Sequence, residues 1–279
     1  MYTIPPKKMV IINILDILKK YSDMDHRLTQ AQIIEILKKE YYMDVDRRTV
    51  KRNLMNLLDF DFGIDYTEII KKNEKGEEIP ICTDWYITRE FDDSEIRLLI
   101  DSVLFSKTIP QKQCKKLIDK LKGLSNIYFE KKVNHICSLP EIRPENKELF
   151  YTIDVLDEAI SKGKKVSFIY NSYGTDKKLH PKREREYVIN PYQMVATNGR
   201  YYLICNYDKY DTLSNYRIDR ITGIKMMNEK RKSIKELKEG EINLPKHMAE
   251  HLYMFAGESI RVKFKAKNYI IDQIIDWFG

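Results

Sequence analysis

Hydrophobic residues near the start of the chain recur at helical spacing. Between residues 7 and 20 they form an i, i+3, i+4, i+7 stripe, which predicts an amphipathic helix. A second helix opens at Thr29, because Gln32 three residues later completes a capping box. A third begins after Asp46, a typical N-cap residue, and runs to about Asp59. The stripe of the first helix contains Ile11, Ile14, Leu15 and Leu18.

The pattern then changes to that of strands. Two runs rich in β-formers, Ile64–Ile70 and Ile79–Ile87, flank the polar segment Lys72–Gly76, which predicts a β-hairpin. Two helices joined by a short turn and followed by a hairpin are the order of a winged helix-turn-helix. We therefore expect residues 1–88 to form a DNA-binding domain of that kind.

Residues 89–146 are helical in pattern but irregular, and we interpret them as a helical connector. The candidate helices are Ser94–Lys107 and Gln111–Leu124. The segment Cys137–Pro144 interrupts the pattern with two prolines and predicts a connection to the next domain.

Residues 147–230 begin with a predicted helix, Lys147–Lys162, and continue as a strand-rich domain with turns near Gly174 and at Asn198-Gly199. The predicted strands are Lys165–Tyr170, Tyr187–Val195, Arg200–Asn206, Ser214–Ile218 and Ile221–Met227.

Residues 231–279 are expected to hold the rest of a charged linker, Asn228–Gly240, and one β-α unit. In that unit Ser259–Ala266 is the predicted strand and Tyr269–Phe278 the predicted helix. One strand does not provide a sheet for this helix, so we expect a C-terminal extension that is incomplete or completed by another chain. The fold class is therefore α+β with several domains.

Composition excludes some classes of protein. The chain is 43% hydrophobic and 33% charged, and no apolar run approaches the roughly 18 residues of a membrane span. Asn13 and Asp16 interrupt the apolar stretch near the start and no small-residue cleavage site follows, so we expect an amphipathic helix of a cytoplasmic protein there instead of a signal peptide. Widely spaced cysteines favour reduced thiols over disulfides or a zinc site. They are Cys82, Cys114, Cys137 and Cys205.

The net charge of +7 permits a polyanionic partner, but its distribution is uneven. Residues 1–90 hold 15 Lys and Arg against 16 Asp and Glu, a net charge of −1. Residues 147–230 hold 15 against 11, a net charge of +4. Bulk charge therefore cannot hold the first domain on DNA, and affinity has to come from a local basic surface.

Such a surface is predicted on the third helix. On a 100° wheel its apolar residues fall within about 100° and face the core. They are Val50, Leu54, Leu57 and Leu58. The opposite arc contains the candidate DNA-binding residues Arg48, Lys51, Arg52 and Asn56, with Arg47 at its edge in the first turn. Arginine can fork onto guanine, Asn can pair with adenine, and Lys suits phosphates. The alternative is a solvated basic face without a partner.

The hairpin tip adds Lys72, with Lys71 and Lys75 beside it, as a candidate phosphate contact. Three nearby glutamates, Glu74, Glu77 and Glu78, argue against a strongly attractive wing.

Three motifs in the strand-rich domain occur in the order and spacing of a known family. They are Asn190-Pro-Tyr-Gln-Met-Val195, Asn198-Gly-Arg-Tyr-Tyr-Leu203 and Tyr216-Arg-Ile-Asp-Arg-Ile221. This stretch resembles the WYL domain, with Tyr201-Tyr202-Leu203 in place of the Trp-Tyr-Leu triplet. The resemblance implies an Sm-like small β-barrel within a bacterial transcriptional regulator that is usually dimeric. It also implies that the domain senses a ligand, which in some members resembles single-stranded nucleic acid.

The resemblance assigns Arg217 and Arg220 of the Arg-x-Asp-Arg motif, with Tyr201 and Tyr202 of the triplet, to ligand binding. Arginine can fork onto phosphate and tyrosine rings can stack on bases. Strand alternation allows at most one tyrosine of the pair to face the ligand. It also leaves open a structural ion pair between Arg217 and Asp219.

A basic segment just before the second strand is a further candidate for closing over an anion, and a solvated loop is the alternative. It contains His180, Lys182, Arg183 and Arg185.

The H-x-x-E-H sequence His247–His251 matches a zinc-peptidase pattern, but it stands beside a linker with no enzyme fold around it. We expect no catalytic residue, metal or cofactor. The leading hypothesis is a homodimeric regulator of transcription that binds double-stranded DNA. The alternatives are a nucleic-acid-dependent enzyme or accessory factor that uses the winged helix only for docking, and RNA binding by the barrel.

Overall fold

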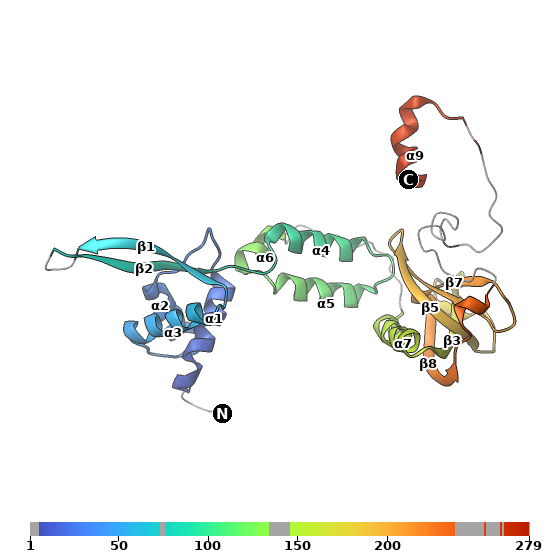
Figure 1. Ribbon diagram of the computed structural model, residues 1–279, viewed down its shortest axis with the longest axis horizontal. Helices are drawn as coiled ribbons and strands as arrows, with labels where there is room; N and C mark the ends of the chain where they lie inside the picture. Colours follow the sequence, from blue (N-terminus) through green and yellow to red (C-terminus); the bar gives the residue numbers. More distant parts are fainter. Residues whose placement is uncertain are drawn as a thin grey trace. The chain divides into compact units, whose positions relative to one another are not determined.

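A computed structural model describes residues 6–72, 76–133, 146–237, 254, 263 and 265–278 (Figure 1). The chain forms two compact units. The first unit comprises Met1–Leu104 and Lys115–Leu139, and the second comprises Phe105–Cys114 and Pro140–Gly279.

Three helices form the core of the first unit, as predicted. They are α1 (Val10–Tyr21), α2 (Gln30–Tyr41) and α3 (Arg47–Asp59). The start of the first predicted helix is instead a short 3-10 helix, η1 (Lys7–Met9). Each helix buries its apolar face against the other two. The fully or almost fully buried side chains are Ile14, Ile17, Leu18, Ile33, Leu37, Val50, Leu54 and Leu57.

The predicted hairpin follows as β1 (Ile64–Lys72) and β2 (Glu78–Ile87), paired antiparallel. Its base is fixed by two backbone hydrogen bonds of 2.8 Å between Leu28 and the buried Trp85. Gly63 leads into β1 with a φ of +68°, and a Cβ there would lie 2.9 Å from the Thr88 carbonyl oxygen. Only glycine fits this turn without strain.

The region predicted as a helical connector contains α4 (Asp93–Phe105), α5 (Gln111–Lys122) and α6 (Ile127–Val133). The first two correspond to the predicted helices, whereas the third has no counterpart among them. Asn126 starts α6, because its side-chain oxygen accepts hydrogen bonds from the backbone N–H groups of Tyr128 and Phe129, both at 3.0 Å.

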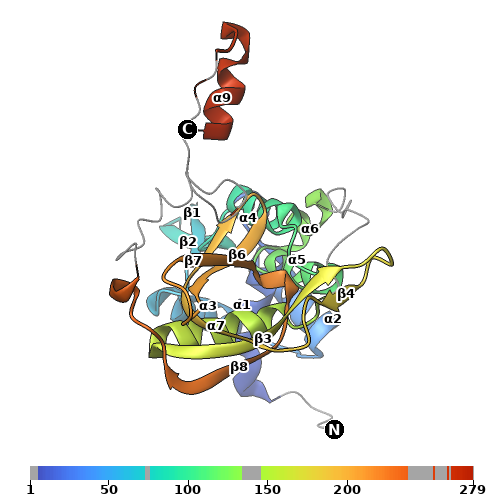
Figure 2. The same cartoon turned by 90° about the vertical axis from the view of Figure 1, so that its right-hand side faces the viewer.

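The second unit pairs α7 (Leu149–Lys162) with an antiparallel sheet, and α7 lies alongside β3 and β8 (Figure 2). The strand order is β4-β3-β5-β6-β7, and β8 also pairs with β3, so the sheet curls on itself. The strands are β3 (Lys164–Tyr173), β4 (Leu179–Pro181), β5 (Tyr187–Thr197), β6 (Arg200–Asn206), β7 (Leu213–Arg217) and β8 (Ile221–Lys230).

Two details of this sheet correct the sequence-based prediction. The strand predicted to end at Ile218 ends at Arg217, and Ile218–Arg220 is a 3-10 helix, η3. The side-chain amide of Asn146 donates to the carbonyls of Asp219 and Ile221 at 3.1 and 2.7 Å, which fixes this turn. Arg220 therefore does not stand on a strand.

The second correction concerns the segment predicted as a linker, Asn228–Gly240. Its first residues belong to β8, and the next segment packs on the sheet instead of leaving it. Arg231 donates to the Pro191 carbonyl at 2.5 Å, the Lys232 backbone N–H donates to Asn190 at 2.9 Å, and Leu237 is buried. A short 3-10 helix, η4 (Ile234–Glu236), lies within this segment.

Strand β6 is buried on both faces. Tyr201, Leu203 and Cys205 pack into the cluster formed with α7, which includes Leu156 and Phe168. Tyr202 and Ile204 point the other way, into a second cluster with Tyr192, Val195, Leu213, Leu237 and Met254. The alternation predicted for the triplet is confirmed, and both of its tyrosines contact a hydrophobic cluster.

Near the C-terminus, η6 (Asn268–Ile270) and α9 (Ile271–Phe278) confirm the last predicted helix. The strand predicted at Ser259–Ala266 falls largely outside the described residues, as do His247–His251 and Cys137–Pro144. Within the described ranges, no helix has both the length and the apolar character needed to cross a bilayer.

Candidate nucleic-acid interface and effector site

The start of α3 is fixed by Asp46. Its carboxylate accepts hydrogen bonds from the Thr49 backbone N–H at 2.9 Å and from the Thr49 hydroxyl at 2.7 Å. These bonds hold the pKa of Asp46 below its ordinary value. With Val50 and Leu54 fully buried, the cap and the core together set the direction in which the opposite face of α3 points.

The predicted DNA-binding residues of α3 separate into two kinds. Arg47 is tied to the preceding helix, because its Nε donates to the side-chain oxygen of the buried Gln30 at 3.0 Å. The other four are exposed and form no side-chain hydrogen bond or ion pair with any described residue. They are Arg48, Lys51, Arg52 and Asn56. The structure thus presents four unpaired polar groups from one rigid helix.

Lys71 and Lys72 are exposed at the end of β1. Lys72 lies opposite Glu78 in the strand register, so an acidic residue accompanies it. Lys75 lies outside the described residues.

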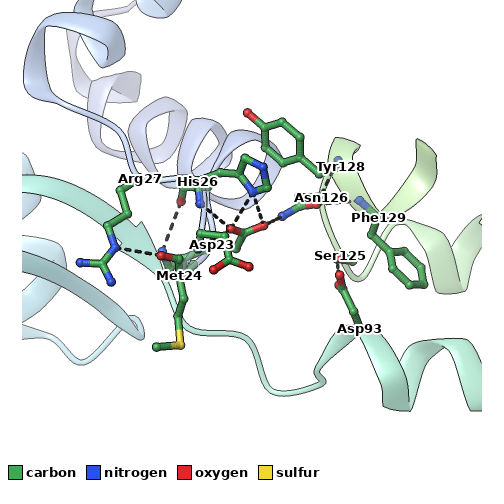
Figure 3. A network of polar contacts seen from close by, with 12 residues as sticks. Asp23, Met24, His26, Arg27, Asp93, Ser125, Asn126, Tyr128 and Phe129 are labelled. Atoms are coloured by element: carbon green, nitrogen blue, oxygen red, sulfur yellow. Dashed lines mark hydrogen bonds and ion pairs between the residues drawn. The ribbon is translucent and has the colours of Figure 1, made fainter. Parts of the chain in front are cut away.

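A polar network fixes α6 against the turn between α1 and α2 (Figure 3). Asp23 accepts a 2.5 Å hydrogen bond from the Asn126 side chain and contacts the His26 Nδ1 at 2.8 Å. The His26 ring stacks on Tyr128, with ring centroids 3.6 Å apart. Burial alone raises the pKa of Asp23, but the hydrogen bonds from His26 and Asn126 outweigh burial and lower it.

Arg89 makes a second connection in the same unit. Its Nη2 donates to the carbonyls of Lys19 and Ser22 at 2.6 and 2.8 Å, at the C-terminal end of α1. The segment between β2 and α4 is therefore attached to the three-helix core, so α4 begins at a fixed point.

In the second unit, five aromatic rings from β3, β5, β7 and the residue after β6 form one cluster. The closest pair is Tyr170 and Tyr216, with centroids 4.7 Å apart and rings nearly perpendicular. The Tyr216 hydroxyl donates to that of Tyr207 at 3.1 Å, and burial followed by this bond raises the pKa of Tyr216 well above its ordinary value. The remaining members are Phe168 and Tyr187.

Basic side chains from the segment between β4 and β5 cover this cluster. The Arg183 Cζ lies 3.4 Å from the centroid of Tyr187, and its Nη2 donates to the Tyr207 hydroxyl at 3.4 Å. The Lys182 Nζ lies 5.5 Å from the centroid of Tyr170. A cation and the face of a tyrosine ring attract each other, so the rings of this cluster hold positive charge beside them.

The two arginines of the Arg-x-Asp-Arg motif have different environments. Arg217 donates to both carboxylate oxygens of the fully buried Asp219, at 3.0 and 2.7 Å. Burial alone lowers the pKa of Arg217, but these bonds more than offset it and raise the pKa. Arg220 lies 5.9 Å from the centroid of Tyr173, and its buried Nε has no hydrogen-bond partner among the described residues.

The other predicted ligand-binding residues lie in less favourable positions. Tyr202 is 4% exposed and Tyr201 is partly buried against the cluster around Phe168. His180 is paired with Asp176, its Nε2 lying 2.9 Å from the carboxylate. Arg185 is exposed, and its carbonyl accepts a hydrogen bond from Arg183 at 3.2 Å.

Sequence reasoning did not assemble the aromatic cluster or single out Arg183 within the basic segment. The one local signal was the i, i+2 spacing of Phe168 and Tyr170, which places both rings on the same face of a strand. The other rings come from β5, β7 and the residue after β6, and only the strand register brings them together.

Comparison with known protein families identifies part of the second unit. Residues 151–226 match the WYL domain family. The chain therefore contains a WYL domain, and the resemblance carried by the three sequence motifs is confirmed. A search of curated proteins found no match.

Among solved structures, the chain is similar to the proteasome accessory factor B/C (PafBC) of Arthrobacter aurescens, at 10% identity and a TM-score of 0.26. The match covers 84% of this chain and 38% of that protein. The chain thus matches less than half the length of that protein.

Proposed function

We propose that this protein is a bacterial, cytoplasmic transcriptional regulator that binds double-stranded DNA through α3. The observation that carries the proposal is the arc of Arg48, Lys51, Arg52 and Asn56, which is exposed, unpaired among the described residues and held on a capped helix. The order of three helices and a hairpin agrees with a winged helix-turn-helix, in which the last helix enters the major groove.

In this proposal Arg48, Arg52 and Asn56 read base edges, while Lys51 and the hairpin's Lys72 contact phosphates. Arg47 sets the angle between α2 and α3 through its hydrogen bond to Gln30, and it also contacts DNA near the start of α3. The chain acts as a homodimer, because readers of this kind pair on two half-sites.

The experiment is selection of bound genomic fragments, followed by a gel shift with the recovered sequence. Replacing both Arg48 and Arg52 with Ala should reduce specific binding at least tenfold, since each bidentate base contact contributes about 1–3 kcal/mol. Lys38→Ala/Lys39→Ala, which removes two exposed charges from α2, is the matched control. Wild-type-like affinity and specificity in the Arg48/Arg52 variant would refute the role of α3.

The WYL domain in this proposal senses an anionic effector with aromatic rings, such as a nucleotide or single-stranded nucleic acid. Lys182 lies over Tyr170 of the aromatic cluster, and Arg220 lies over the Tyr173 ring of the same strand. With the exposed Arg185, they supply the positive charge. The unpartnered Nε of Arg220 supports an anion there, because a buried donor without an acceptor is costly. His180 lies next to this basic segment, paired with Asp176, and Arg217 supports the site through Asp219.

Titration calorimetry with single-stranded oligonucleotides tests this sensing role. Lys182→Gln with Arg220→Gln should abolish the binding heat, whereas Lys225→Gln, an exposed lysine on β8, should not change it. Equal heats in all three proteins would contradict the proposed site.

The loop between α4 and α5 offers the route from effector to DNA. It belongs to the second unit, where the Lys107 backbone N–H donates to the Gly199 carbonyl at 2.6 Å and Ile109 packs against the core. Effector binding that is tighter in one arrangement of this loop would shift the population of DNA-binding states.

The chain is not an enzyme in this proposal. The competing hypothesis, an enzyme or accessory factor docked by α3, predicts a metal-dependent activity that is lost on His247→Ala. RNA binding by the WYL domain as the main function would instead leave the Arg48/Arg52 variant fully active.

A further inference from the structure

Helix α5 carries a strongly basic face that neither the core nor the proposed effector site uses. One side of the helix packs inward through Cys114 and Ile118, which are buried. The other side exposes four lysines, Lys112, Lys115, Lys116 and Lys120. We call these four residues the α5 lysine face. The segment 111–133, which is α5 with α6, carries seven lysines against two acidic residues, a net charge of +5.

The α5 lysine face is continuous. Helical geometry of 100° per residue places Lys112, Lys116 and Lys120 within about 80° of one another, and Lys115 about 60° to the other side. Lys112 and Lys120 are about 12 Å apart along the axis at 1.5 Å per residue. Asp119 is the acidic residue of α5 and stands within the same arc.

These lysines lack the ion pairs that some lysines elsewhere in the described structure form. Lys20 pairs with Glu40 at 2.9 Å, and Lys165 pairs with Asp208 and Glu229 at 2.6 and 2.9 Å. No described acidic side chain forms an ion pair with any member of the α5 lysine face. Like charges four residues apart destabilise a helix, so the face carries an electrostatic cost that Asp119, the one acidic residue of α5, offsets only in part.

We propose that the α5 lysine face binds the phosphate backbone of double-stranded DNA outside the site contacted by α3. The inference rests on the proposed function. Residues 1–90 have a net charge of −1, so the domain that carries α3 provides little general attraction for DNA. A row of lysines about 12 Å long matches roughly three to four successive phosphates, which advance about 3.4 Å each along one strand. Lysine acts there as a mobile point charge that suits phosphate without reading sequence.

The test compares two duplexes that contain the same selected site. The short duplex covers only the bases protected through α3, and the long duplex extends them by about one helical turn on each side. Fluorescence anisotropy gives the Kd at several salt concentrations. The variant replaces all four lysines of the face with Gln, which preserves helix propensity. A matched control replaces the exposed Lys177, Lys178, Lys209 and Lys230 with Gln.

For the long duplex, the slope of log affinity against log salt should become shallower by about 2–3.5 in the α5 variant, since each lost phosphate contact removes about 0.9. For the short duplex the slope should match that of the wild type. The control should follow the wild type on both duplexes. Replacing the four lysines with Arg should restore the steep slope, and Asp119→Asn should steepen it beyond the wild type.

A wild-type slope for the Gln variant on the long duplex would overturn the proposal, and would then indicate that the face meets an acidic protein or solvent alone. Failure of the proposed function looks different, because the wild-type protein would then show no sequence preference on either duplex. Circular dichroism verifies that each variant is folded, and the Asp119→Asn variant tests the proposal without removing any lysine.

Discussion

The guanidinium of Arg217 lies against the carboxylate of Asp219, with Nε and Nη2 donating to its two oxygens at 3.0 and 2.7 Å. Asp219 is fully buried and the Arg217 side chain is 17% exposed. Such a pair stabilises the folded domain, because removing either member would leave the other as an uncompensated charge in the interior. The two arginines of the Arg-x-Asp-Arg motif therefore differ in role. Arg217 stabilises the fold through Asp219, whereas the Arg220 Nε has no hydrogen-bond partner among the described residues.

Arg217→Gln should destabilise the WYL domain by about 3 kcal/mol, the usual cost of leaving one partner of a buried ion pair unpaired. Arg220→Gln should cost less than about 1 kcal/mol, because it removes no ion pair within the described structure. Hydrogen exchange of β6 and β7 amides measures both. Equal protection in the two variants would show that the Arg217–Asp219 pair is not structural.

Gly63→Ala should destabilise the first unit more than Gly76→Ala. Both glycines have positive φ, of +68° and +79°, so backbone strain in the alanine variant should lower stability by about 1–2 kcal/mol at either position. At Gly63 the new Cβ also meets the Thr88 carbonyl at 2.9 Å, whereas at Gly76 nothing lies within 4 Å. Urea unfolding followed by the fluorescence of the buried Trp85, with Trp277 replaced by Phe in all the proteins compared, should resolve the difference, and equal midpoints would contradict it.

Acid should loosen the packing of α6. The pKa of Asp23 is lowered from its ordinary value of 3.8 in the folded state. Its contribution is therefore fully present above that value and is lost as the pH falls through the lower, folded pKa. Hydrogen exchange of the α6 amides should accelerate in that range. Asp23→Asn should remove this acid dependence, and a dependence that persists in the variant would assign it to another carboxylate.

Gly199→Ala should weaken the response to effector more than it weakens DNA binding. Gly199 has a φ of +70°, and a Cβ would lie 3.0 Å from the Phe105 carbonyl oxygen, so the loop between α4 and α5 has to shift. Asn198→Gly is the control, because glycine also adopts the φ of +51° found there. Anisotropy titrations with and without a single-stranded oligonucleotide measure the coupling. An unchanged oligonucleotide effect in Gly199→Ala would exclude this loop as the route.

Local chemistry explains which elements were predictable. Thr29 with Gln32, and Asp46 with Thr49, make their cap bonds within four residues of sequence, so both helix starts could be placed from sequence. The Asn198-Gly199 turn likewise placed β6 correctly, because both residues adopt the positive φ that the turn needs.

Long-range contacts account for the rest. The three residues of β4 carry no strand pattern of their own and are ordered by pairing with Asn171–Tyr173. The start of α6 depends on an Asn126 side chain that also reaches Asp23, about a hundred positions earlier. The proposed effector site is similar. The motif indicated Arg220, but the aromatic cluster is assembled by the pairing of β3 with β5, of β5 with β6 and of β6 with β7, and this register is a tertiary property.

The burial of β6 on both faces has a consequence for how its register is chosen. Where one face of a strand is exposed to solvent, a shift of its pairing register by one residue exposes apolar side chains and is therefore unfavourable. In β6 a slip would exchange one set of apolar residues for another, so hydrophobicity alone discriminates poorly. The buried Asn190 and Asn206, which are register partners joined by a side-chain hydrogen bond of 3.3 Å, provide the missing discrimination. Any other alignment would break the side-chain hydrogen bond between Asn190 and Asn206 inside the sheet, so this polar pair favours a single register of β6 against β5.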